Sequence, residues 1–234
     1  MSGKHIFSLC AGAVILLALY LLLRTRTKRQ QILVLGILSF AGIIGIIFDL
    51  AAHEDILLYL PLHLCSFTAF LLPAAVLTRN KTICNILLLW AYGSIMALLT
   101  NEAETAWNPG SPDFWAFFLS HVLEFGIPLL LFALGLAERD RRCIPLTLVI
   151  TLAVCIAVHF INLRINQHLE LTGASFRVNY MFTEWPDNAF MMIFWNILPY
   201  PFWYELLFFP LAFGWLLLAT IGSGKKRKEK AESN

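Results

Sequence analysis

The chain has 234 residues, of which 59% are hydrophobic and 14% are charged, and its formal net charge is +2. Soluble domains carry roughly a quarter of charged residues, so this composition excludes a soluble globular protein, and long apolar blocks exclude a disordered or collagen-like chain. Most basic residues lie in short clusters between the apolar blocks, which predicts topology signals and no nucleic-acid partner. The sequence therefore predicts a polytopic membrane protein in contact with membrane lipids.

Seven apolar blocks follow one another along the chain. They cover residues 6–23, 31–48, 58–77, 83–100, 114–136, 144–163 and 199–221. A helix needs roughly 20 apolar residues to cross a bilayer core, and backbone groups inside lipid must be satisfied within the segment, which favours helices over barrel strands. We expect an all-α fold, a single seven-transmembrane helix bundle over residues 1–224, followed by a basic polar cytoplasmic tail at residues 225–234.

The basic residues alternate in density between the two ends of these helices. Fourteen of the 17 Lys and Arg residues follow the first, third, fifth and seventh blocks, and only Lys4, Arg164 and Arg177 lie on the other side. Cytoplasmic loops carry the excess of positive charge. We therefore predict a protein of the cell membrane, with its N-terminus outside and its C-terminus on the cytoplasmic side. The first block lacks a small-residue cleavage site after it, which favours a retained helix over a signal peptide.

Ionisable and other polar side chains inside the blocks gather in one layer, the outer half of the bilayer. The members of this layer are Asp49, His63, Cys65, His121, Glu124, His159, Asn162 and Glu205. We expect Cys65 and Glu205 about two turns inside the third and seventh helices. Polar groups are costly in hydrocarbon and are functional candidates by default. His121 and Glu124 are three residues apart, as are His159 and Asn162, so each pair shares a helix face.

Each of these residues also has a structural explanation. Intramembrane histidines often hydrogen bond between helices, and buried cysteines are usually small inert hydrophobes, which fits Cys10, Cys84, Cys143 and Cys155. Cys65 differs because His63 and Ser66 flank it. The five cysteines show no CxxC or paired spacing, so we expect neither a disulfide framework nor a metal cluster.

Two connections on the predicted outer side have unusual compositions. Residues 176–204 hold eleven of the 32 aromatic residues, together with Pro186, Pro199 and Pro201. This density favours either an aromatic belt at the membrane interface or a lid over an outer cavity. The stretch NPGSPDFW at residues 108–115 is typical of a tight turn.

Three stretches carry a resemblance to a known family. LPLHLCSF at residues 60–67, VNYMF at residues 178–182 and the aromatic and proline-rich entry to the seventh block resemble the YwaF-like integral membrane family. That family includes an animal branch of transmembrane acyltransferases that remodel ether phospholipids, and the resemblance implies a cysteine nucleophile at Cys65. A more distant similarity, to the androgen-induced transmembrane hydrolases of fatty-acid esters, implies a histidine roughly ninety residues after the nucleophile. His159 lies 94 residues after Cys65, and His121 is the competing base.

The predicted chemistry is acyl transfer or hydrolysis of a lipid ester. Cys65 is the nucleophile, His159 or His121 is its base, and Glu124 or Asn162 orients the histidine. The candidates for substrate binding are His63, Asn162, Asn179, Tyr180 and Glu205. The expected substrate is a phospholipid or lysophospholipid, with no cofactor and no metal.

Other functional classes fit the same residues. A transporter or lipid-binding membrane protein could use the His, Asp and Glu side chains as a relay, although no internal repeat supports a common transporter architecture. A seven-helix receptor would need larger cytoplasmic loops. His63, His121 and His159 share a predicted depth and are an alternative metal site.

Overall fold

The computed structural model describes residues 3–100 and 108–221, and within these residues every regular element is helical, with no strand. The longer helices are α1 (Gly3–Leu23), α2 (Lys28–Leu38), α3 (Ala41–Ala52), α4 (Leu64–Thr78), α5 (Lys81–Thr100), α6 (Pro112–Ala133), α7 (Ile144–Leu171), α8 (Ala189–Ile197) and α9 (Phe208–Ala219). Short 3-10 helices lie in the connections: η1 (Ile56–Leu58), η3 (Arg141–Cys143), η4 (Tyr180–Phe182) and η5 (Trp203–Leu207). The predicted all-α fold class is confirmed.

Five helical segments are long and apolar enough to cross a membrane. They are α1, α2 together with α3, α5, α6, and η3 together with α7. The segments at the third and seventh predicted blocks, α4 and η5 with α9, are apolar but shorter. The protein is therefore a multi-pass membrane protein, whereas seven crossings and the sidedness of the termini stay predictions.

Helices α4 and α9 begin later than the third and seventh apolar blocks do. Cys65 lies in the first turn of α4, and Glu205 lies in η5, so both predicted depths of about two helical turns were wrong. Pro61 and Pro201 explain the difference. A proline lacks the backbone N–H and disfavours the helical conformation of the residue before it, so the chain stays irregular until each proline has been passed.

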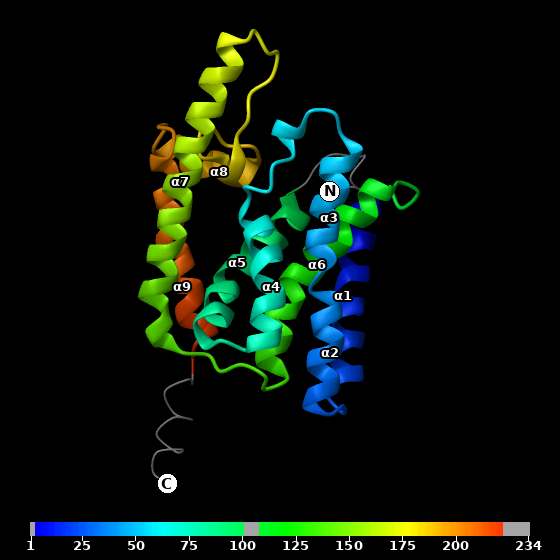
Figure 1. The fold of residues 1–234 in the computed structure, drawn as a ribbon. Coiled ribbons are helices and arrows are strands. Elements are labelled where there is room, and N and C mark those ends of the chain that lie inside the picture. Colours follow the sequence, from blue (N-terminus) through cyan, green and yellow to red (C-terminus); the bar gives the residue numbers. More distant parts are fainter. Residues whose placement is uncertain (1–2, 101–107, 222–234) are drawn as a thin grey trace.

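Helix α7 extends beyond the predicted apolar block by eight residues, up to Leu171. Its 28 residues correspond to about 42 Å, which is longer than a bilayer core. The helix ends where Gly173 adopts a φ of 72°, a left-handed conformation that suits glycine. In Figure 1 the upper part of α7 rises above the rest of the bundle. The end of an apolar block therefore did not mark the end of the helix.

Helix α6 has a central place in the bundle, because it contacts α1, α3, α4 and α5. Helices α7 and α9 pack on each other and on α5, on the other side of the molecule (Figure 1). Leu72 of α4, Leu87 of α5, and Ile127 and Leu131 of α6 are at most 1% exposed and belong to the main core. The core thus joins the helices that carry the Cys65 and His121 side chains.

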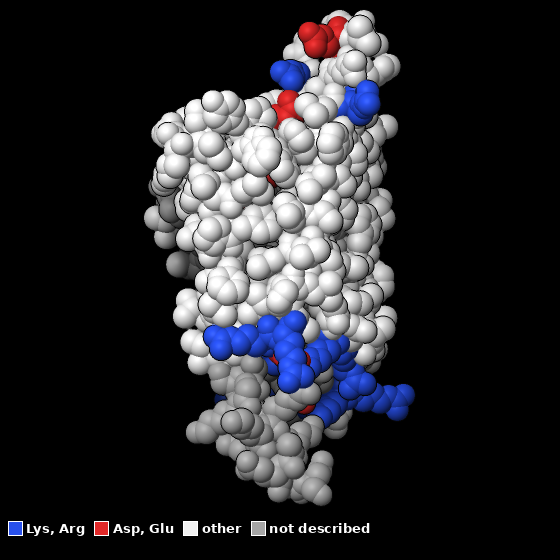
Figure 2. All heavy atoms as spheres, turned by 90° about the vertical axis from the view of Figure 1, so that its left-hand side faces the viewer, with Lys and Arg blue, Asp and Glu red and all other residues white. Residues whose placement is uncertain are grey.

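Basic side chains gather around one end of the molecule, below a broad band without visible charged atoms (Figure 2). At this end Asn85 ties down the connection between α6 and α7, because its amide donates to the Glu138 carbonyl and accepts from the Asp140 N–H. Lys81 forms an ion pair with Asp140. The predicted basic tail at residues 225–234 lies outside the described residues.

Candidate functional site

A cavity of about 1200 Å³ lies among α3 to α7 and α9, and residues 181–191 contribute to its wall. The wall is mostly apolar, and among the described residues no Lys or Arg lines it. Four acidic side chains do line it: Asp49, Glu124, Asp187 and Glu205. Asp187 lies in the connection before α8, where burial raises the pKa of its carboxyl above the ordinary value. A cavity of this size suits an apolar ligand with a polar end.

Cys65 occupies the first turn of α4, and the residue is half-buried and lines the cavity. The N-cap of this helix is His63, which has extended backbone angles. The N–H groups of Cys65 and Ser66 belong to this first turn, where backbone N–H groups have no partner within the helix. Ser66, the next residue, also lines the cavity. The start of α4 thus leaves backbone N–H groups without helical partners at the residue that carries the thiol.

His121 and Glu124 of α6 lie next to Cys65. The thiol sulfur, one ring nitrogen of His121 and one carboxylate oxygen of Glu124 all lie within 4.8 Å of one another. Glu124 is 3% exposed, while Cys65 and His121 are partly exposed to the cavity. The structure therefore brings together three of the four residues predicted as catalytic.

Hydrogen bonds orient both members of the α6 pair. The Nδ1 atom of His121 lies 2.7 Å from the carbonyl oxygen of Phe117, which can only accept, so Nδ1 carries the proton and Nε2 holds the free lone pair. The Ser94 hydroxyl of α5 donates to Oε2 of Glu124 over 3.1 Å. His121 is thus in the tautomer that a base requires.

Close packing of α3 against α6 confines the Glu124 side chain. A Cβ atom on Gly42 would lie 2.3 Å from Oε1 of Glu124 and 2.7 Å from the Cβ of Ala69. One turn along α3, a Cβ atom on Gly45 would lie 2.5 Å from Oγ of Ser120, whose hydroxyl donates to the Ala41 carbonyl over 3.2 Å. Glycine at these positions lets the helices approach far enough for Glu124 to reach the thiol.

His63 has the opposite tautomer to His121. Its Nδ1 accepts a hydrogen bond of 3.2 Å from the backbone N–H of Met181, so in the neutral ring the proton is on Nε2. The ring lines the cavity and packs against Tyr180 and Phe182, with centroid distances of 5.8 and 5.4 Å. His63 thus belongs to the cavity wall and carries its proton on Nε2, and its role in substrate binding stays a prediction.

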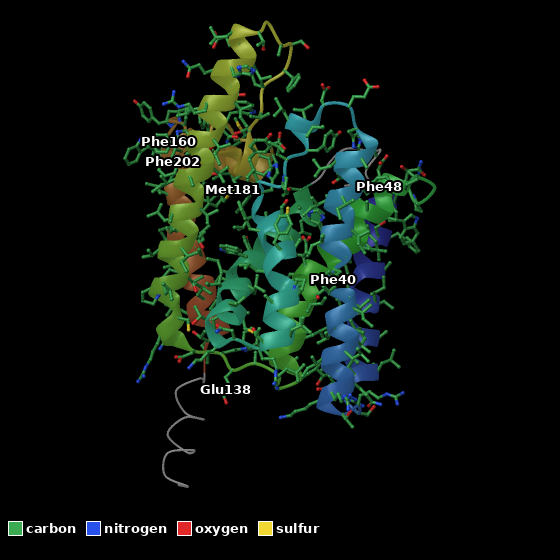
Figure 3. All side chains as sticks on the ribbon, in the orientation of Figure 1. Phe40, Phe48, Glu138, Phe160, Met181 and Phe202 are labelled. Atoms are coloured by element: carbon green, nitrogen blue, oxygen red, sulfur yellow. The ribbon has the colours of Figure 1, made fainter. Side chains whose placement is uncertain are left out.

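His159 is placed elsewhere. Its Nδ1 lies 3.1 Å from Oγ1 of Thr183, and its ring lies 5.2 Å from that of Phe202. His159 is not among the residues that line the cavity. Figure 3 labels Phe160 and Phe202 on the side of α7 that faces away from α4. The structure thus does not join the first-choice base to Cys65.

Asn162, predicted to orient His159 or to bind substrate, holds the chain instead. Its side chain donates to the Tyr180 carbonyl and Thr183 hydroxyl, each over 2.9 Å, and accepts from the Tyr180 N–H. One turn further, Asn166 makes the same paired hydrogen bonds with the backbone of Val178. These two amides attach residues 178–183 to α7.

Asn179 and Tyr180, also predicted to bind substrate, hold the same connection. The Asn179 side chain donates to the Trp185 carbonyl and accepts from the Glu184 N–H. The Tyr180 hydroxyl donates to the carbonyl of Leu57. The Tyr180 side chain is 1% exposed. Through these hydrogen bonds Asn179 and Tyr180 both anchor the connection in the structure.

The aromatic segment at residues 176–204 contributes several side chains to the cavity wall, among them Met181, Phe182 and Phe190. Met181 and Phe182 have φ values of 54° and 62°, which are costly for residues with a Cβ atom and are held by the surrounding hydrogen bonds. In Figure 3 Met181 lies on the α4 side of the upper part of α7. This geometry favours the lid over a simple interfacial belt.

Glu205 lies in η5 and lines the cavity wall. Its Oε2 atom is buried and has no hydrogen-bond partner in the described structure. A buried carboxyl oxygen without a partner is costly, which makes Glu205 available to a ligand in the cavity. The role of Glu205 in substrate binding stays a prediction.

Ser94 and Gly42 contribute to the site but did not stand out in the sequence. A serine in an apolar helix commonly bonds its own backbone, and glycines are frequent in membrane helices, so neither type signals a site by itself. The useful signal was the GxxG spacing of Gly42 and Gly45, which places two small residues on one face of α3.

Comparisons with known proteins gave a single family. Searches among curated proteins and solved structures returned no significant match. Residues 1–219 match the model of the TMEM164 family, a transmembrane protein family, and this range includes every element of the site. With nearly the whole described structure inside the match, the chain belongs to the TMEM164 family.

Proposed function

We propose that this protein is a lipid acyltransferase of a cellular membrane, with Cys65 as nucleophile and His121 as base. The observation that carries the proposal is the meeting of a thiol, an imidazole and a carboxylate within 4.8 Å at the wall of a large apolar cavity. The resemblance around LPLHLCSF supports the nucleophile. The charge asymmetry of the loops supports a site in the outer half of the bilayer.

The first half-reaction acylates the enzyme. Nε2 of His121 takes the proton from Sγ of Cys65, and the thiolate attacks the ester carbonyl carbon of a phospholipid. The bond between that carbon and the glycerol oxygen breaks, and the oxygen takes the proton back from His121. The products are acyl-Cys65 and a lysophospholipid. Burial of the thiol in an apolar wall opposes charge formation, which is why the base must be in contact with it.

Glu124 and the beginning of α4 stabilise the charges that form in this step. The carboxylate of Glu124 lies within 4.8 Å of a ring nitrogen of His121 and stabilises the imidazolium by its charge, while the Phe117 carbonyl accepts from Nδ1–H and fixes the ring. We assign the oxyanion of the tetrahedral intermediate to the first-turn N–H groups of Cys65 and Ser66 and to the Nε2–H of His63.

The second half-reaction returns the thiol. The hydroxyl of a lysophospholipid gives its proton to His121 and attacks the thioester carbonyl, and the thiolate leaves and is reprotonated. If water takes the place of this hydroxyl, the product is a fatty acid and the protein is a hydrolase. The mostly apolar cavity wall favours a lipid acceptor over water.

The test is to isolate the acyl-enzyme. The full chain in lipid nanodiscs, incubated with a phospholipid that carries a labelled acyl chain, should form an adduct at Cys65 that hydroxylamine removes. Cys65→Ala should abolish the adduct and turnover. Cys65→Ser should be nearly as inactive, because a hydroxyl is much harder to deprotonate than a thiol.

Cys155 supplies the matched control, because it is the other cysteine at the cavity wall. Cys155→Ala should keep the adduct. Full turnover in a folded Cys65→Ala variant would contradict the proposal that Cys65 is the nucleophile of an acyltransferase. If the same variant kept full lipid flux while Glu124 or Glu205 substitutions stopped it, the protein would be a transporter.

A further inference from the structure

The three groups proposed to form the acyl-enzyme are also a complete ligand set for a thiophilic divalent cation. Zn²⁺ binds Cys sulfur, His nitrogen and carboxylate oxygen at about 2.0–2.3 Å, so neighbouring ligand atoms around one ion lie roughly 3.5 Å apart. Cys65, His121 and Glu124 present these three atom types within 4.8 Å of one another. Small rotations of the side chains bring them to the coordination distance.

The outer partners of these ligands are those found around protein metal sites. A metal-binding histidine donates its other ring N–H to a backbone carbonyl or a carboxylate, and a ligating carboxylate is itself hydrogen bonded. Nδ1 of His121 is paired with the Phe117 carbonyl at 2.7 Å, which directs Nε2 as the ligand. The Ser94 hydroxyl donates to Glu124 at 3.1 Å.

The surroundings favour a cation. Asp49, Asp187 and Glu205 line the same cavity, and no Lys or Arg of the described chain does. A divalent ion that enters the cavity therefore meets acidic groups and no fixed positive side chain. Cys65 is at the cavity wall, so a fourth coordination position is open to water from the cavity.

We propose that Cys65, His121 and Glu124 form a Zn²⁺ site, and that occupation of this site blocks acyl transfer. On binding, the Cys65 thiol releases its proton to solvent, and the thiolate and the lone pair of His121 are donated to the ion. Nucleophile and base are then both engaged, and removal of the ion restores the thiol. The blocking role rests on the proposed function, whereas the ion site itself does not.

Co²⁺ is the probe for the site, added to the metal-free full chain in detergent micelles. Tetrahedral Co²⁺ with a thiolate ligand gives visible d–d bands and a thiolate-to-metal charge-transfer band, and Zn²⁺ should bleach both. Cys65→Ala should lose the charge-transfer band, and Cys155→Ala, which changes the other cysteine of the cavity wall, should keep it. Ser94→Ala should weaken Co²⁺ binding about 10-fold, as loss of an outer partner does.

The activity arm separates this inference from the proposed function. Zn²⁺ should stop formation of acyl-Cys65 in the metal-free chain, and a chelator should restore it. A chain that forms acyl-Cys65 but gives no thiolate–Co²⁺ band would overturn the ion site and leave the acyltransferase. Activity that is lost on chelation and regained with Zn²⁺ would overturn the blocking role. A Co²⁺ band in a chain that never becomes acylated would support the ion site and contradict the thiol mechanism.

Discussion

Helices α6 and α7 each carry a histidine followed three residues later by a polar side chain, yet the two pairs do different things. His121 and Glu124 of α6 meet Cys65 at a cavity wall. His159 and Asn162 of α7 bind the connection that follows their own helix. Equal spacing therefore placed both pairs on a helix face without deciding what that face meets.

The difference follows from the chemistry of the second residue in each pair. An amide has both a donor and an acceptor and pairs with a peptide backbone, which is how Asn162 holds Tyr180. A carboxylate has only acceptors, so Glu124 accepts a hydrogen bond from the Ser94 hydroxyl and places a carboxylate oxygen within 4.8 Å of the thiol sulfur. The α6 pair is therefore suited to catalysis at Cys65, and the α7 pair to holding residues 180–183 against α7.

Exchange of each histidine for alanine is the largest test of this comparison. His121→Ala should slow the formation of acyl-Cys65 by roughly 100-fold or more, the usual cost of losing a general base. His159→Ala should leave that rate within a few-fold of wild type, because His159 contacts Thr183 and Phe202. Rapid-quench measurement of labelled acyl-enzyme checks both variants.

The reverse result would identify His159, and not His121, as the base. If His159→Ala gave the larger loss while His121→Ala acylated normally, the contact of His121 with Cys65 would be structural. Thermal unfolding of both variants, compared with wild type, identifies a loss that is due to misfolding.

Asn162→Ala tests the architectural pair. It removes the acceptor of the buried Tyr180 N–H and one of the two donors to the Tyr180 carbonyl, and an unsatisfied buried N–H costs about 1–3 kcal/mol. We expect a lower unfolding temperature and faster proteolysis within residues 178–185, while a chain that is still folded acylates Cys65. Asn162→Asp keeps only the acceptor and should be intermediate in stability. Unchanged proteolysis of Asn162→Ala would contradict this role.

Gly42→Ala tests the packing behind the α6 pair and has the smallest expected effect. The added methyl group would overlap Glu124 and Ala69, and overpacking of this kind costs about 1–3 kcal/mol. The variant should unfold at a lower temperature and acylate more slowly, because Glu124 is displaced. Gly214→Ala is the control, since nothing lies within 4 Å of its added Cβ atom. Equal unfolding temperatures for the two variants would show that α3 is free to move.

Composition and block length were enough to predict an all-α, multi-pass membrane protein, because the bilayer imposes the same requirement on every segment that crosses it. The same cost of polar groups in hydrocarbon identified Cys65, His121 and Glu124 as candidates. These inferences need only local chemistry and periodicity, which the sequence contains.

The choice between His121 and His159 depended on tertiary structure. A helical period gives the direction of a side chain around its own axis, but the partner is set by how helices pack, and here Gly42 and Gly45 bring α3 close to α6. The residue at which α4 begins was likewise not set by the apolar pattern. It depends on Pro61 and on contacts with residues far along the chain, such as that between His63 and Met181. Close packing joins residues that are remote in sequence. The sequence therefore identified the candidate residues of the site, and only the tertiary structure determined which of them are in contact.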